Sequence, residues 1–174
     1  MAFCLNDVFY PKSKARITLK VLFICTHNRC RSILSEAITN HASQGKIEAQ
    51  SAGSQPVGEV HPLSIKYLQE AGISTEGLIS QSWDEFEDFA PDVVITVCDN
   101  AAGETCPLWF GKSVKVHWGL ADPSKLSGSE DEIAQAFRAT IDEITQRVNA
   151  MLNVDVDTQD QEALREAFQA LGAQ

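Results

Sequence analysis

The feature of this sequence that most constrains its fold is a buried strand, a polar loop and a helix in direct succession. Residues 19–24 form a mostly apolar run with β-branched and aromatic members, which predicts a buried strand. The loop that follows has the pattern Cys-x5-Arg-Ser, from Cys25 to Ser32. Apolar residues then recur on one side of a predicted helix over residues 33–41. A strand that runs through a polar loop into a helix is typical of parallel α/β sheets.

The rest of the chain continues this alternation. Further strands are expected at residues 47–52, 92–97 and 114–116, and further helices at 61–71, 129–148 and 158–171. Ser129 precedes Glu132 by three residues, which is the spacing of a capping box. We therefore expect an α/β fold, with a four-stranded parallel sheet and helices on both faces in a Rossmann-like arrangement of three layers. Ligands of such sheets bind beyond the carboxyl ends of the strands, where Cys25, Cys98 and residues 117–122 are expected.

Length and charge narrow the range of functions. The chain has 174 residues, 44% of them hydrophobic, which suffices for one domain with a packed core. Its formal net charge of −10 argues against nucleic-acid and membrane partners, because phosphate groups are held by Lys and Arg. An anionic substrate would need a local positive pocket. No apolar run approaches the ~20 residues of a membrane span.

The cysteines and the first residues predict a cytoplasmic protein. Five cysteines are too few and too unevenly spread for a secreted disulfide scaffold. Residues 1–18 carry basic side chains but lack the apolar core of a secretory signal, so we expect a surface extension with Cys4 as a bystander thiol. The chemistry is expected in a domain over residues 19–152, followed by a helical tail over residues 153–174.

The polar loop has the composition of an anion-binding site. Its backbone N–H groups and the positive end of the following helix would hold a tetrahedral oxyanion. Arg31 would add a planar fork of donors. The same groups favour the thiolate of Cys25, to which Ser32 can donate a hydrogen bond. The predicted oxyanion-binding residues follow Cys25: Thr26, His27, Asn28, Arg29, Cys30 and Arg31.

Several of these side chains also have a purely structural interpretation. Cys25 alone would be taken as a buried and inert cysteine, and only its place in this loop favours a nucleophile. Cys30 is expected to pack beneath the loop rather than take part in redox chemistry. His27 and Arg29 either add positive charge at the mouth or are solvated. Asn28 suits a loop position with positive φ.

The loop, together with the later pair Asp122-Pro123, resembles the low-molecular-weight protein tyrosine phosphatase superfamily. The resemblance covers residues 19–152. It implies a phosphatase-like fold and a role for Asp122 as general acid at the anion pocket. On its own, an aspartate before proline is more often a turn residue. His27 departs from the pattern, since family members often have glycine there, and this affects the backbone expected for the loop.

Two further cysteines distinguish reduction from hydrolysis. Cys98 and Cys106 flank a polar segment, and a relay of thiols can supply the two electrons that a reductase needs. This segment and residues 117–123 resemble the arsenate reductases of the same superfamily. The resemblance implies that arsenate binds the loop, with phosphate or sulfate as analogues, and that Cys25 attacks arsenic. It also implies that the resulting disulfide passes through Cys98 to Cys106.

The resemblance further implies an external reductant and no bound cofactor. Thioredoxin or a glutaredoxin/glutathione system would reduce the last disulfide, and two resolving cysteines favour thioredoxin. Trp118 is expected near the site, although a tryptophan is more often a packing residue than a platform for a ligand. Some family members bind a monovalent cation close to the loop, to which Asn28, Glu36 and Ser51 could contribute by position. We do not predict that site, because Gln81 stands where a carboxylate would be needed.

Three other functions fit parts of the pattern. A tyrosine phosphatase would use the same loop and Asp122 without the later cysteines. A structural zinc site would use four thiols, but the seven residues between Cys98 and Cys106 are a wide spacing, and Arg31 favours an anion. A non-enzymatic domain could bind oxyanions or sense redox state. The three thiols together with the anion loop favour the reductase, and no metal is expected.

Overall fold

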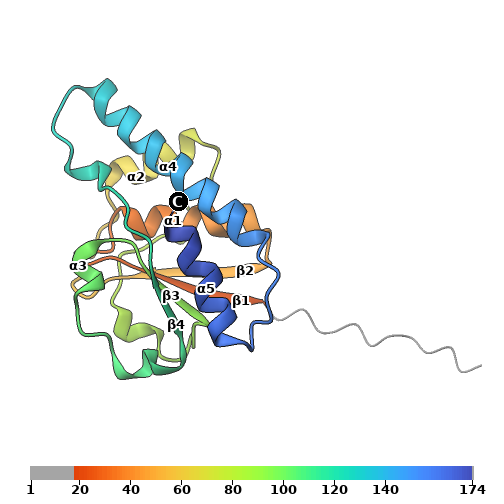
Figure 1. Ribbon diagram of the computed structural model, residues 1–174. Coiled ribbons are helices and arrows are strands. Elements are labelled where there is room, and N and C mark those ends of the chain that lie inside the picture. Colours follow the sequence, from red (N-terminus) through yellow and green to blue (C-terminus); the bar gives the residue numbers. More distant parts are fainter. Residues whose placement is uncertain (1–17, 174) are drawn as a thin grey trace, which may run out of the picture.

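Four parallel strands form the centre of the fold, in the order β2-β1-β3-β4 (Figure 1). The computed structural model of the chain describes residues 18–173. The strands are β1 (Leu19–Ile24), β2 (Ile47–Ala52), β3 (Val93–Thr96) and β4 (Val114–His117). The α-helices are α1 (Arg31–Ser43), α2 (Pro62–Glu70), α3 (Asp99–Ala102), α4 (Glu130–Leu152) and α5 (Gln161–Gly172). Three 3-10 helices are η1 (Trp83–Phe86), η2 (Leu108–Lys112) and η3 (Pro123–Lys125).

The sheet is covered on both faces, as the sequence predicts. Successive side chains of a strand point to opposite faces, and Val21, Leu22, Phe23 and Ile24 of β1 are all buried. Helix α1 packs on β1 and β2, and α4 packs on α1 and α2. Figure 1 shows these helices above the sheet and η1 below it. The expected α/β fold with a four-stranded parallel sheet is confirmed.

Helix α4 begins where the capping signal places it. The Ser129 hydroxyl accepts a hydrogen bond from Glu132 N at 3.2 Å, and Glu132 Oε2 accepts one from Ser129 N at 2.7 Å. The two side chains thus satisfy backbone donors that the first turn leaves free. The apolar face predicted for this helix is buried at Phe137, Ile141, Ile144 and Val148.

Helix α1 begins at Arg31, two residues earlier than expected. Its N-cap, Cys30, forms no side-chain capping hydrogen bond, so the sequence carries no Ser, Thr, Asp or Asn signal for this boundary. The difference matters for the site, because Arg31 and Ser32 belong to the rigid first turn of a helix.

Helix α5 packs on β4, and Trp118 holds it there. The Trp118 indole is 1% exposed, its Nε1 donates to Phe168 O at 2.9 Å, and its ring lies 6.0 Å from that of Phe23. Trp118 was expected near the site from its place after a strand. Its side chain instead points into the core and serves packing.

The expected N-terminal extension, with Cys4, lies outside the described residues except for residue 18. Within residues 18–173, no helix combines the length and the apolarity that crossing a bilayer requires.

Candidate active site

A cavity of about 280 Å³ lies at the carboxyl end of β1, over residues 25–32, which we call the anion loop. Six of the predicted site residues in the loop line it together with Asp122. The lining residues are Cys25, Thr26, His27, Arg29, Cys30, Arg31, His61, Asn100, Asp122, Ser124 and Lys125. Basic side chains are concentrated here although the chain is acidic overall, which is the local positive pocket that an anionic substrate needs.

Cys25 lies at the base of this cavity. Its side chain is buried, and its Sγ lies 2.9 Å from Ser32 Oγ. Asn28 Nδ2 donates to Ser32 Oγ at 2.8 Å. Because that hydroxyl oxygen already accepts a hydrogen bond, its own proton is available to the sulfur. Ser32 can therefore stabilise a Cys25 thiolate, as the sequence predicts.

Asn28 is the structural centre of the loop. It adopts a φ of 45°, which confirms the expected left-handed conformation. Its side chain is fully buried, with Nδ2 also donating to Ser51 Oγ at 3.0 Å and Oδ1 accepting from Gln81 N at 2.8 Å. Only the backbone of Asn28 can therefore contact a bound oxyanion.

Hydrogen bonds to the loop carbonyls fix its backbone. Gln55 N donates to Thr26 O at 2.9 Å, and His61 N donates to Arg29 O at 2.9 Å. In a peptide unit, the N–H and the C=O point in opposite directions. Because these carbonyls point outward to neighbouring segments, the N–H groups of the same units point toward the cavity. The loop is thus arranged as a cradle for an anion.

Gly53, at the end of β2, lies directly against this cradle. A Cβ at Gly53 would come within 2.5 Å of Thr26 O and 2.9 Å of Cys25 O. Sequence reasoning used Gly53 only as the end of a strand. The close approach of two backbones, which only glycine permits, could not be predicted from local pattern.

Arg31 and Asp122 meet at the mouth of the cavity. Arg31 Nη2 lies 3.1 Å from Asp122 Oδ2, and Nη1 donates to Leu120 O at 3.1 Å. Asp122 Oδ1 accepts from both the backbone N and the hydroxyl of Ser124, at 3.0 and 2.6 Å. These contacts place a carboxylate and a guanidinium within reach of any anion bound over Cys25.

Two other side chains that line the cavity have pKa values shifted in opposite directions. Burial raises the pKa of Cys30 to about 12, and its side chain is 2% exposed, so it stays a neutral thiol. The structure thus agrees with a packing role for Cys30. Burial, followed by the charge of Arg29, lowers the pKa of His61. His61 was taken only as a helix start, and it is also the N-cap of α2, but its position in the cavity lining was missed.

Cys98 lies next to the anion loop, although 72 residues separate it from Thr26. Its Sγ is 3.7 Å from Thr26 Oγ1 and accepts a hydrogen bond from Ala101 N at 3.4 Å. Cys98 is 2% exposed. The structure therefore brings the second predicted cysteine to the anion loop.

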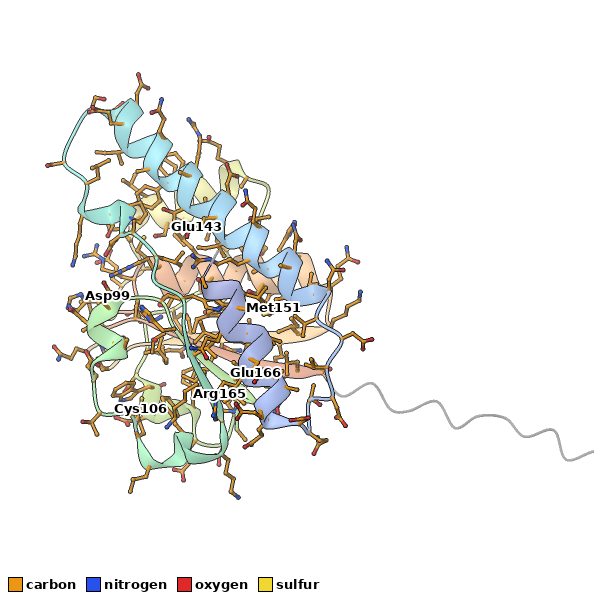
Figure 2. All side chains as sticks on the ribbon, viewed as in Figure 1. Asp99, Cys106, Glu143, Met151, Arg165 and Glu166 are labelled. Atoms are coloured by element: carbon orange, nitrogen blue, oxygen red, sulfur yellow. The ribbon has the colours of Figure 1, made fainter. Side chains whose placement is uncertain are left out.

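Cys106 lies apart from this pair. It is partly buried and lines a second cavity with His117. Figure 2 shows Asp99 and Cys106 on the same side of the molecule, at opposite ends of the segment that contains α3. Cys25, Cys30, Cys98 and Cys106 are all free thiols.

A contact that the sequence analysis missed ties α3 to β4. His117 Nε2 lies 3.1 Å from Asp99 Oδ1, and His117 Nδ1 lies 2.9 Å from Thr96 Oγ1. Asp99 directly follows Cys98, so this contact holds the start of the segment in place. The Asp99 side chain is 94% exposed, and such a contact is weak enough to break.

A buried polar chain extends from Cys25 below the loop. Ser51 Oγ donates to Glu36 Oε2 at 2.5 Å, and Gln81 Nε2 donates to Ser51 O at 3.2 Å. Burial raises the pKa of Glu36 to about 7, against the opposing effect of the Ser51 hydrogen bonds. Among residues 18–173 no group of three or more His, Cys, Asp or Glu side chains is arranged to hold a metal ion.

Comparison with known proteins agrees with this site. The family model "Low molecular weight phosphotyrosine protein phosphatase" matches residues 20–167. An arsenate reductase of Halalkalibacterium halodurans is 34% identical over 128 residues, which cover 74% of this chain and 91% of the relative. A glutaredoxin arsenate reductase of Synechocystis is 29% identical over 133 residues, or 76% of this chain and 95% of the relative.

Solved structures give the same result. An arsenate reductase in the phosphate-binding state superposes with a TM-score of 0.65 at 30% identity, over 77% of this chain and 96% of the other. A thioredoxin-dependent arsenate reductase of Corynebacterium glutamicum superposes with a TM-score of 0.55 at 30% identity, over 76% of this chain and 62% of the other. The anion loop, the sheet and these matches show that the chain belongs to the low molecular weight phosphotyrosine protein phosphatase family.

Proposed function

We propose that this protein is an arsenate reductase that reduces arsenate to arsenite with three of its own thiols. The observation that carries the proposal is the position of Cys98, whose Sγ contacts Thr26 of the anion loop directly beside Cys25. A hydrolytic phosphatase has no use for a second cysteine at this point. The relatives named arsenate reductase support the same conclusion.

In the first step, arsenate binds the loop in the manner of phosphate. Backbone N–H groups of residues 26–31 and the Arg31 guanidinium bind its oxygens. The Cys25 thiolate attacks arsenic and forms an S–As bond. Asp122, held at the mouth by Arg31 and Ser124, passes a proton from one hydroxyl of the bound dihydrogen arsenate to the departing hydroxyl, which leaves as water. The solved relative in a phosphate-binding state supports phosphate as an analogue.

In the second step, Cys98 attacks the sulfur of the Cys25 adduct. A Cys25–Cys98 disulfide forms while the S–As bond breaks, and its electron pair goes to arsenic, which leaves as arsenite. The two thiols lose two electrons, and arsenic(V) gains them. The contact of Cys98 with Thr26, the residue that follows Cys25, supports this step.

In the third step, Cys106 attacks Cys98, releases Cys25 as a thiolate and leaves a Cys98–Cys106 disulfide. Because Cys106 lies in another cavity, the segment must rearrange, and its weak Asp99–His117 contact suits that movement. An external dithiol then reduces the disulfide. Relatives are named for either glutaredoxin or thioredoxin, and two resolving cysteines favour thioredoxin here.

The assignment of the remaining parts follows from this chemistry. We assign the reaction to residues 19–152, with residues 1–18 as an extension and residues 153–174 as a helical tail. Thiols that must be reduced after each turnover favour a cytoplasmic location.

Hydrolysis of aryl phosphates is the second candidate, because the loop, Arg31 and Asp122 serve a phosphatase equally well. A Cys98→Ser variant separates the two. We expect it to hydrolyse p-nitrophenyl phosphate as the parent does but to lose arsenate-dependent oxidation of thioredoxin. Arsenite release that persists unchanged in this variant, with thioredoxin as reductant, would overturn the thiol relay.

A further inference from the structure

A carboxylate that no step above uses lies within residues 98–106, the segment that runs from Cys98 to Cys106. Glu104, between Cys98 and Cys106, turns back toward the anion loop, where its Oε1 accepts a hydrogen bond from Thr26 Oγ1 at 3.3 Å. Its other oxygen, Oε2, is buried and has no hydrogen-bond partner among the described residues. A buried polar atom without a partner is costly, and such atoms are concentrated at functional sites.

The hydrogen bonds around Thr26 have a defined direction. A carboxylate can only accept, so the Thr26 hydroxyl directs its proton to Glu104. The lone pairs of Thr26 Oγ1 are then free to accept from the Cys98 thiol, 3.7 Å away. The three groups form a chain from Cys98 through Thr26 to Glu104, along which a proton can move toward the carboxylate.

The second step of the reaction needs such a path. The attacking group in disulfide formation is a thiolate, and a free cysteine is ionised to only a few per cent at neutral pH. Cys98 is 2% exposed, so its proton has little access to solvent. Ala101 N, which donates to Cys98 Sγ at 3.4 Å, can stabilise the thiolate but cannot take the proton.

We propose that Glu104 is a positioning residue that draws the Cys98 proton through Thr26 and so prepares Cys98 for attack on the Cys25 adduct. This inference rests on the proposed reductase function. The Cys98 thiol gives its proton to Thr26 Oγ1 as the Thr26 hydroxyl gives its own to Glu104. The Cys98 thiolate then forms the S–S bond, the S–As bond breaks, and its electron pair reduces arsenic(V) to arsenic(III). Glu104 loses the proton to solvent when the segment opens.

The competing explanation is that Glu104 only tethers the segment to the loop through its hydrogen bond to Thr26. The Glu104→Gln variant distinguishes this tether from proton transfer. The glutamine oxygen can still accept from Thr26 and keep the tether, but an amide cannot take a proton. Glu166→Gln is the control, since it makes the same substitution at an exposed position of α5. Thr26→Val breaks the chain, and Thr26→Ser restores its hydroxyl.

The experiment measures single-turnover formation of the Cys25–Cys98 disulfide in a Cys106→Ser background, where the relay stops at that bond. Reduced protein is mixed with excess arsenate without an external reductant, quenched at intervals and analysed by the masses of tryptic peptides. Rates are recorded from pH 6.5 to 9.5. The other ionisable side chains near this hydrogen-bonded chain, Cys25, Asp99 and His117, are the same in the parent and in the Glu104→Gln protein.

We expect Glu104→Gln to slow disulfide formation about tenfold or more at pH 7 and to approach the parent rate above pH ~9, where hydroxide ionises the thiol. Glu166→Gln should follow the parent profile, Thr26→Val should follow Glu104→Gln, and Thr26→Ser should recover. A Glu104→Gln rate equal to the parent, or lower by one constant factor at all pH values, would refute the role of Glu104. No Cys25–Cys98 disulfide in the parent would instead refute the relay itself, and this inference with it.

Discussion

Arg31 and Asp122 form an ion pair across the mouth of the anion loop, with 3.1 Å between Nη2 and Oδ2. Each side chain is about one-sixth exposed, at 16% and 15%, so the pair is accessible to a ligand yet shielded from bulk water. The pairing orients the guanidinium fork before substrate arrives. An incoming oxyanion therefore meets a donor group that is already in position.

Replacing Arg31 by lysine tests this arrangement. Lysine keeps the charge but loses the planar fork that contacts Asp122, Leu120 O and the oxyanion together. We expect kcat/KM for arsenate to fall by about 10²–10³-fold. The measurement is arsenate-dependent oxidation of thioredoxin, with inhibition by phosphate as a test of binding. Arg165→Lys, on the exposed face of α5, is the control, and a similar small effect for both variants would contradict the prediction.

The buried carboxyl of Glu36 should make stability depend on pH. Burial raises its pKa from 4.5 to about 7, so the folded protein keeps a proton that the unfolded chain loses. The free energy of unfolding should fall by about 3 kcal/mol as pH rises from 4.5 to 7, and then level off.

Urea denaturation of wild type and Glu36→Gln at half-unit pH intervals measures this contribution. The amide does not titrate, so this part of the pH dependence should vanish in the variant. Glu132→Gln is a useful comparison, because its carboxylate is exposed and accepts the Ser129 capping hydrogen bond. Equal slopes for wild type and Glu36→Gln between pH 5 and 7 would show that Glu36 is not the cause.

The cysteines should differ sharply in their reaction with iodoacetamide. Cys30 is buried and its pKa is raised to about 12, so it should remain unlabelled at pH 8 in the folded protein. Cys25, at the base of the open cavity, should be labelled and should be protected by phosphate. Peptide masses after brief labelling test both statements. Rapid labelling of Cys30 in folded protein would contradict its role in packing.

Gly53→Ala should reduce phosphate binding by the loop more than it reduces the stability of the whole fold. The new methyl group would collide with Thr26 O and Cys25 O, so the backbone of the cradle must shift. We expect a loss of ~1–3 kcal/mol in the free energy of unfolding and a larger relative loss of phosphate binding. Gly111→Ala, whose Cβ would meet no atom within 4 Å, is the control. Normal phosphate binding by Gly53→Ala would show that the loop tolerates the contact.

Local pattern determined the fold and the first half of the site. A continuous apolar run predicts β1, and an apolar face of period three to four predicts α4, because each depends on neighbours along the chain. Ser129 marks the start of α4 by a bond over three residues. The loop of Cys25 and Arg31 was predictable because its motif, Cys-x5-Arg-Ser, lies within eight consecutive residues. Where the local signal was absent, as at the Cys30 cap, the predicted boundary was two residues late.

Tertiary structure alone decided which distant side chains meet at that loop. The Thr26–Glu104 bond joins residues 78 positions apart, and the Ser51–Glu36 bond joins two elements through the core. Trp118 follows a strand end as the site residues do, yet its indole packs against α5. Sequence periodicity assigns a residue to an element and a face, but the contacts of its side chain depend on how those elements pack. Only the folded chain therefore shows Glu104 hydrogen-bonded to Thr26, which in turn contacts the Cys98 thiol that Glu104 is proposed to serve.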